Sequence, residues 1–283
     1  MVAWWGDDED NLFKMRYGFD DLELIGDHMF TIGVPSNSNE TFRKYVFAAA
    51  KAYNLGIKMD YTYKKYSSNW NLVNQDEDVI LITSALNMIK ETFIDNLDYI
   101  MSIKNKPDDF NLFMCSASLV RLQNTFKSAS ILIKSYMHFE AVSMLRIILE
   151  QLAWIFTVHN SIQICTDIKP TACIKNLKKI YPLIGNLYGE LSTGVHMSSD
   201  SFTKFVRLDD DDFSIHLTDI EEAKYDAFIL IYLLDVFSVV GEFVYANLIT
   251  EHRFIQKVGD LFELKEDRMT KLLLDKYIKL LRK

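Results

Sequence analysis

Cysteine, proline and glycine are scarce in this chain of 283 residues, which has three Cys, four Pro and ten Gly. Few turn-forming residues favour long helices over the many short strands of an all-β protein. The cysteines, Cys115, Cys165 and Cys173, are odd in number and show no CxxC spacing. This argues against a disulfide framework and a thiolate zinc site, and it indicates reduced thiols in a cytoplasmic protein.

The chain also lacks the motifs of several large enzyme classes. It contains no Walker A loop, GxGxxG, HExxH or GxSxG sequence, which argues against an NTPase, a dinucleotide enzyme, a zincin and an α/β-hydrolase. The acidic run at residues 209–212 has neither the alternating oxygen ligands nor the Gly of an EF-hand loop. We therefore predict a solvated loop there, and neither a metal nor a cofactor for this protein.

A positive net charge is absent as well. The formal charge of −8 at pH 7 should repel polyanions, so broad DNA or RNA coating is not expected, although a local basic groove is compatible with it.

Residues 1–11, MVAWWGDDEDN, show neither the basic nor the apolar region of a signal peptide. The most apolar stretch, 227–249, contains Asp235 and Glu242, which are costly inside a bilayer. We expect a buried helix and no membrane partner.

Apolar residues are abundant, at 49% hydrophobic composition, and they recur at three- and four-residue spacing. Helices are predicted over residues 41–56, 76–103, 108–159 with a break at 135–138, 169–181, 219–250 and 261–283. The aromatic-rich segment 60–78 predicts a loop, and 207–223 a short strand or extended loop. We predict an all-α fold whose bundle-like core of long antiparallel helices lies in a domain of residues 76–283. Residues 1–75 form a leader, one helix and the polar loop.

One predicted helix carries charges in an apolar setting. The sequence SMLRIILEQLAWIF, residues 143–156, places Arg146 and Glu150 one helical turn apart. A charge inside an apolar helix core needs a partner, because an isolated buried ion costs several kcal/mol or more. Glu150 can supply one, and Asp235 or Glu242 a second if their helix packs alongside. A structural ion-pair network and a functional site both fit this pattern.

A second candidate segment, LSTGVHMSS, follows in a glycine-clustered region. It holds Ser192, Thr193 and His196, which can fold over the charged helix. His titrates near neutrality, so His196 can act as an acid or base beside an Arg that stabilises a phosphate. A surface or hydrogen-bonded structural histidine is the other interpretation.

The pairing of LRIILE with the later LSTGVH resembles uncharacterised bacterial helical proteins with an Arg-x-x-x-Glu helix and a Ser-x-x-x-His segment. Those proteins look like distant members of the HEPN (higher eukaryotes and prokaryotes nucleotide-binding) superfamily, and the match covers about residues 110–250. Many HEPN proteins are ribonucleases of toxin, abortive-infection and phage-defence systems. The resemblance implies a HEPN-like core and a homodimer, with Arg146, Glu150, Ser192 and His196 as site residues and Arg146 and His196 as the RNA-cleaving pair.

The chain departs from the HEPN hallmark in one respect. Catalytic HEPN proteins have an Arg followed by a His after four to six residues, whereas the nearest such pair here, Arg207 and His216, has eight between them. Two hypotheses follow. The protein is an RNA-directed effector, a candidate metal-independent endoribonuclease of a toxin or phage-defence system, or it is a non-catalytic helical module that binds a protein or nucleotide partner.

Two further segments combine residues able to contact nucleic acid. Lys175, Lys178 and Lys179 recur at helical spacing and can bind phosphates, or they form a solvated helix face. The stretch YTYKKYSSNW, residues 61–70, interleaves tyrosines with Lys64 and Lys65, a combination that can stack bases and neutralise a backbone. Packing of these aromatic residues against the core is the alternative.

Overall fold

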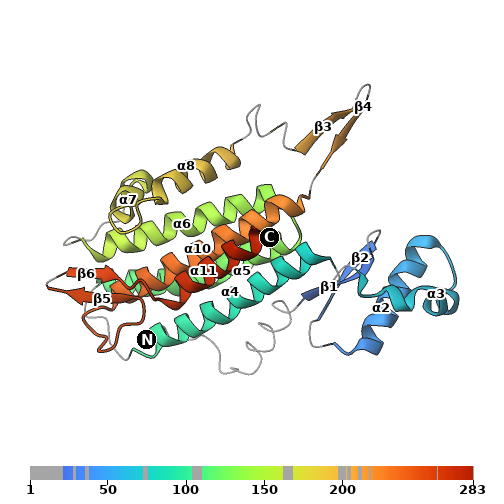
Figure 1. Ribbon diagram of the computed structural model, residues 1–283, viewed down its shortest axis with the longest axis horizontal. Coiled ribbons are helices and arrows are strands. Elements are labelled where there is room, and N and C mark those ends of the chain that lie inside the picture. The colour runs from blue at the N-terminus through green and yellow to red at the C-terminus, as the bar shows by residue number, and fades with distance from the viewer. Residues whose placement is uncertain are drawn as a thin grey trace. The chain divides into compact units, whose positions relative to one another are not determined.

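The computed structural model describes residues 22–27, 30–35, 38–72, 76–103, 110–161, 168–196, 202, 205–209, 212–216, 218–259 and 261–282. The chain divides into two compact units (Figure 1). The amino-terminal unit is Ala3–Leu81, and the helical unit is Ile82–Lys283 together with Met1–Val2. The boundary between the two units lies inside the helix Glu77–Met101.

The amino-terminal unit is a small α/β assembly. Strands β1 (Leu22–Asp27) and β2 (Phe30–Pro35) pair antiparallel, and helices α2 (Glu40–Leu55) and α3 (Met59–Tyr66) and the 3₁₀ turn η1 (Ser67–Asn69) follow. Its core cluster contains the fully buried Ile25, Val34 and Phe47. Helix α2 begins at the cap Asn39, whose side chain accepts a hydrogen bond from the Phe42 amide.

The helical unit is built from seven helices within the described residues. They are α4 (Glu77–Met101), which begins in the amino-terminal unit, α5 (Phe110–Lys134), α6 (His138–His159), α7 (Pro170–Leu177), α8 (Ile184–Val195), α10 (Ile220–Val244) and α11 (Met269–Leu281). Two antiparallel hairpins, β3 (Val206–Asp209) with β4 (Asp212–Ile215) and β5 (Ile255–Val258) with β6 (Leu261–Leu264), complete it. The predicted all-α class is confirmed.

Helix α10 is the centre of the bundle because it is apolar on almost every side. It packs against α5, α6 and α11, and the rings of Phe93, Phe126 and Phe237 join α4 and α5 to it, with centroids 4.5 to 5.7 Å apart. The contacts also give the helix directions: α10 runs antiparallel to α5 and α11, and in the same direction as α4 and α6.

Among the described residues, α6 and α10 are long and apolar enough to cross a membrane by length and composition alone. In their most apolar windows, 61% of the residues of α6 and 83% of those of α10 are buried inside the protein. Core helices of this kind pass the same test, so the two helices are weak evidence for a membrane protein.

Several predicted helix ends agree with the structure. The break between α5 and α6 occurs where expected, at Tyr136, whose φ of 59° is left-handed. Asp219 caps α10 by accepting hydrogen bonds from the amides of Glu221 and Glu222. Gly56, with φ of 64°, ends α2 in the left-handed conformation that favours glycine.

Three predicted elements differ from the structure. The leader predicted before the first helix contains the paired strands β1 and β2. Residues 60–78 were expected to form a loop, yet most of α3 lies there because Thr62 is buried and α3 packs on α2. The last helix was expected to begin at residue 261, but Leu261–Leu264 is strand β6 and α11 begins at Met269. Pairing with β5 accounts for this difference, because residues 255–258 supply the hydrogen-bonding partner for an extended segment.

Candidate functional site

The two segments of the candidate site lie on neighbouring helices. Helices α6 and α8 pack together. Tyr188 of α8 contacts Glu150 of α6, and Gly194, later in α8, faces Val142, earlier in α6. The two helices therefore run antiparallel. A Cβ placed on Gly194 would lie only 2.9 Å from Val142 Cγ1. Glycine therefore permits the close approach of the two helices at this end. We call the contact line between α6 and α8 the α6–α8 seam.

Arg146, Glu150 and Tyr188 form a polar cluster in the seam. Arg146 Nε donates a 3.0 Å hydrogen bond to Glu150 Oε1, and the Tyr188 hydroxyl donates to the same oxygen at 3.3 Å. The Arg146 guanidinium carbon lies 5.6 Å from the centroid of the Tyr188 ring, within cation–π range. The predicted pairing of Arg146 with Glu150 is confirmed, and Tyr188 is a member of the cluster that the sequence did not indicate.

The cluster is only partly shielded from water. The side chains of Arg146 and Glu150 are 24% and 26% exposed. Burial lowers the pKa of Arg146, but the hydrogen bonds with Tyr188 and Glu150 outweigh it and raise that pKa overall. The guanidinium is therefore a fixed, permanently charged donor held at the edge of the seam.

Ser192 continues the seam one helical turn beyond Tyr188. Its hydroxyl oxygen is buried and has no hydrogen-bond partner among the residues that the structure describes. A buried polar group without a partner costs about 1 to 3 kcal/mol. Ser192 is thus a buried polar group in the seam that forms no hydrogen bond with the described part of the chain.

His196 lies at the carboxyl end of α8, where it forms the C-cap with extended backbone, φ −93° and ψ 132°. Its side chain is exposed. At 1.5 Å per residue, it follows Tyr188 by about 12 Å along the helix axis. The structure thus places Arg146, Glu150 and Tyr188 together and Ser192 next in line, with His196 at the far end of α8. The pairing of Arg146 with His196 stays a prediction.

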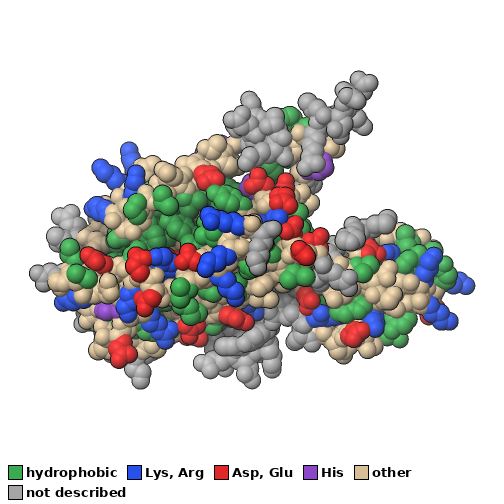
Figure 2. Space-filling model, viewed as in Figure 1, with side chains coloured by type: hydrophobic (Ala, Val, Ile, Leu, Met, Phe, Trp, Pro, Cys, Tyr) green, Lys and Arg blue, Asp and Glu red, His purple; other side chains and the backbone are tan. Residues whose placement is uncertain are grey.

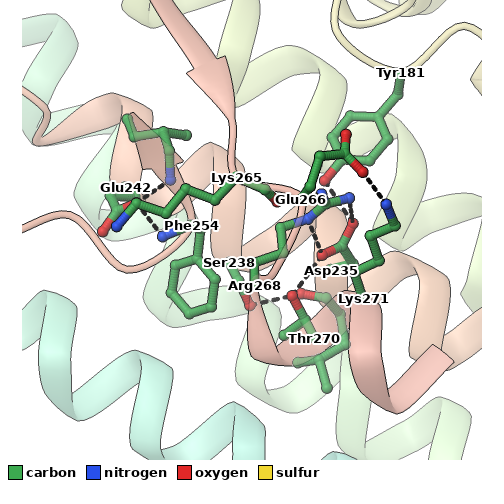
Figure 3. A network of polar contacts seen from close by, with 12 residues as sticks. Tyr181, Asp235, Ser238, Glu242, Phe254, Lys265, Glu266, Arg268, Thr270 and Lys271 are labelled. Carbon is green, nitrogen blue, oxygen red and sulfur yellow. Dashed lines mark hydrogen bonds and ion pairs between the residues drawn. The ribbon is translucent and has the colours of Figure 1, made fainter. Parts of the chain in front are cut away.

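The second polar line of the sequence has partners other than Arg146. Figure 3 shows Asp235 with Arg268, Thr270 and Tyr181 around its carboxylate. Arg268 donates from Nε and Nη2 at 2.7 Å each, and the Tyr181 hydroxyl donates at 2.8 Å. Asp235, one of the two expected second partners of Arg146, therefore pairs with Arg268 instead. Asp235 points toward the start of α11, whereas Arg146 points toward α8.

Glu242 likewise serves the fold. Its fully buried carboxylate accepts hydrogen bonds from the backbone amides of Arg253, Phe254 and Ile255 at 2.5 to 2.7 Å, and from the Tyr99 hydroxyl at 3.0 Å. Burial, with the adjacent Glu242 charge, raises the pKa of Tyr99 well above its usual value. Glu242 thus holds the chain that leads into β5 against α10, and the expectation that it pairs with Arg146 was wrong.

A histidine that the sequence analysis did not single out makes a further polar contact between α6 and α10. His138 Nδ1 lies 2.9 Å from Asp226 Oδ2, and its Nε2 lies 3.9 Å from Glu222. Both His138 and Asp226 are buried. Glu222 and Asp226 are four residues apart, so the sequence alone places both carboxylates on one helix face. That His138 is the side chain they face could be identified only from the packing of α6 on α10.

The remaining predicted features are the three cysteines and the acidic run at residues 209–212. Among the described residues, no group of three or more His, Cys, Asp or Glu side chains could hold a metal ion. Cys115 and Cys173 are buried and form no disulfide within the described residues, and Cys165 lies outside them. Of the acidic run, Asp209 ends β3 and pairs with Asp212 at the start of β4, and residues 210–211 lie outside the described part.

Comparison of the chain with models of known protein families, with curated proteins and with solved structures finds no match. The HEPN resemblance therefore rests on the quoted motifs alone.

Proposed function

We propose that this protein is an RNA-directed effector of a bacterial toxin or phage-defence system, with a HEPN-like core, and that RNA contacts the α6–α8 seam. The observation that carries the proposal is the packing of the two helices that hold the motif segments: Arg146 and Glu150 on α6 contact Tyr188 on α8, one turn before Ser192. Segments remote in sequence thus contribute to one partly exposed seam. By analogy with the superfamily, the protein acts in the cytoplasm as a homodimer.

The chemistry of these side chains suits a phosphodiester. Arg146 is a fixed cation that can stabilise charge on phosphate oxygens, and the unpartnered Ser192 hydroxyl can bind a ligand oxygen. In metal-independent cleavage, the ribose 2′-hydroxyl loses its proton to a base and its oxygen attacks phosphorus. The bond from phosphorus to the 5′ oxygen breaks, and that oxygen takes a proton. We assign the proton-transfer role to His196, whose imidazole is exposed at the carboxyl end of α8.

A specific observation favours the second candidate, a non-catalytic helical module that binds a protein or nucleotide partner. Glu150 already neutralises Arg146, and about 12 Å of helix separates Tyr188 from His196. A seam of this kind can recognise a ligand without cleaving it.

The deciding experiment incubates the purified full chain with total cellular RNA, with Mg²⁺ or with EDTA, and sequences the cleaved ends. We expect cleavage in both buffers by the wild type and by Arg121→Gln, which removes an exposed arginine of α5, and no cleavage by Arg146→Gln or His196→Ala. Intact RNA in every lane would refute cleavage and favour the binding module. Equal cleavage by all variants would show that the α6–α8 seam takes no part in the reaction.

A further inference from the structure

The amino-terminal unit exposes an aromatic surface on α2. Phe42, Tyr45 and Tyr53 are 47%, 51% and 89% exposed. At 100° per residue, all three fall within a sector of about 80° on the side of the helix opposite Phe47, which is buried. Burial in the core of this unit therefore does not explain these rings.

Helix α3 extends the aromatic surface. The rings of Tyr45 and Tyr63 stack with centroids 4.4 Å apart and an interplanar angle of 23°. Tyr61 is 53% exposed, and Lys65 Nζ donates a 3.2 Å hydrogen bond to its hydroxyl while lying 5.5 Å from its ring centroid. We define the aromatic–lysine face as the tyrosines described above on α2 and α3 together with the exposed lysines of α3 and of the residue before it: Tyr45, Tyr53, Tyr61, Tyr63, Lys58, Lys64 and Lys65.

This face also holds lysines without a carboxylate partner among the described residues of the unit. Three other cations are neutralised by carboxylates, in the pairs Arg43–Glu23, Lys44–Glu40 and Lys51–Asp27. In contrast, Lys58, Lys64 and Lys65 are exposed and make no ion pair with any residue that the structure describes. Helix α3 contains one acid, Asp60, in its first turn. Figure 2 shows Lys and Arg side chains beside hydrophobic ones over α2 and α3.

We propose that the aromatic–lysine face binds single-stranded RNA, with exposed tyrosine rings stacking on bases and Lys58, Lys64 and Lys65 neutralising phosphates. The proposal goes beyond the α6–α8 seam, because it adds an RNA-binding surface on another unit, and it rests on the proposed function in choosing RNA. The combination of rings and cations favours a single strand over an acidic peptide, since a peptide of carboxylates would use the lysines alone. A duplex would keep its bases stacked inside and leave the rings without partners.

The test measures binding of the full chain to a fluorescein-labelled oligouridine of about 12 nucleotides by fluorescence anisotropy over a salt series. Tyr53→Ala and Tyr61→Ala should each weaken binding about tenfold, because each removes one stacking platform. Lys64→Gln with Lys65→Gln should reduce the slope of log K against log salt by about 1.4, the value for two phosphate contacts on a single strand. All four changes are at exposed side chains, so melting curves should be unchanged.

The matched control is Lys276→Gln with Lys279→Gln, which removes the same charge from exposed positions of α11. We expect this pair to leave the affinity and the salt slope as in the wild type. Equal weakening by the two lysine pairs would show attraction by total charge alone and overturn the proposal. Unchanged binding by both tyrosine variants, or competition by poly-glutamate as strong as by unlabelled oligouridine, would overturn it as well.

The same proteins separate this proposal from the seam proposal. Oligouridine binding that depends on Tyr53 and Tyr61, with total RNA left intact, would support the aromatic–lysine face while cleavage at the seam fails. Cleavage that requires Arg146 and His196, with unchanged anisotropy in the tyrosine variants, would support the seam and overturn the face.

Discussion

The substitution Arg268→Met tests whether the buried pair with Asp235 holds α11 on α10. Arg268 and Asp235 have side chains 8% and 2% exposed, and they share two 2.7 Å hydrogen bonds. Arg268 also donates to the Lys265 carbonyl at 2.8 Å. Methionine fills much of the same volume but leaves the buried carboxylate with only Thr270 and Tyr181 as donors.

The expected loss is about 3 to 5 kcal/mol in the free energy of unfolding, because removing one partner strands a buried charge. For a unit of this size, that loss corresponds to a melting temperature lower by about 10 °C. Arg253→Met is the matched control. Its pair with Asp95 has side chains 47% and 61% exposed, so the expected cost is about 1 kcal/mol, including the lost contact with the Tyr99 ring.

The assay is urea denaturation followed by circular dichroism, with the double variant Asp235→Leu and Arg268→Met as the third protein. Removing both charges should cost less than Arg268→Met alone, because no stranded carboxylate is left. A cost for Arg268→Met no larger than for Arg253→Met would refute the reasoning and show that water reaches Asp235.

Three smaller predictions follow. Glu150→Ala should cost less than about 1 kcal/mol in urea denaturation, because the Arg146–Glu150 pair is partly exposed. Gly194→Ala should cost about 1 to 3 kcal/mol by forcing α8 away from Val142, and adding Val142→Ala should cost less than the sum of both single changes. Burial and the nearby Asp235 charge raise the pKa of Tyr232 to about 12 from 10.0. The folded state keeps this proton while the unfolded state loses it, so stability should fall as pH rises from about 10 to 12, and Tyr232→Phe should flatten that fall.

Each of these has a contradicting result. A loss above about 2 kcal/mol for Glu150→Ala would show a far more buried pair than the structure describes. Strictly additive costs for Gly194→Ala and Val142→Ala would mean that the two side chains do not meet. If Tyr232→Phe leaves the slope of the free energy of unfolding against pH unchanged, the loss of stability at alkaline pH comes from other tyrosines.

Much of the helical architecture could be predicted because its signals are local. Caps such as Asp219 and Asn39 act within one turn of the chain, and the break between α5 and α6 lies at Tyr136, inside the range 135–138 that the sequence indicated. The Arg146–Glu150 bond is local too, since residues four apart on a helix are neighbours whatever the helix packs against.

Of the candidate site, the sequence indicated Arg146, Glu150, Ser192 and His196 but not their spacing in three dimensions. Tyr188 joined the cluster only because α8 lies antiparallel to α6. Its type and position carry no pattern that distinguishes it from a core tyrosine.

What the sequence by itself determined was the class of the fold, most helix positions and the local ion pair. Tertiary structure decided the partners of the buried charges: Asp235 meets Arg268 across 33 residues, His138 meets Asp226 across 88, and Glu242 meets Tyr99 across 143. It also decided that residues 59–66 form a helix and 261–264 a strand. The physical reason is that helix geometry brings together only residues three or four apart, whereas distant contacts depend on how whole elements bury their apolar faces.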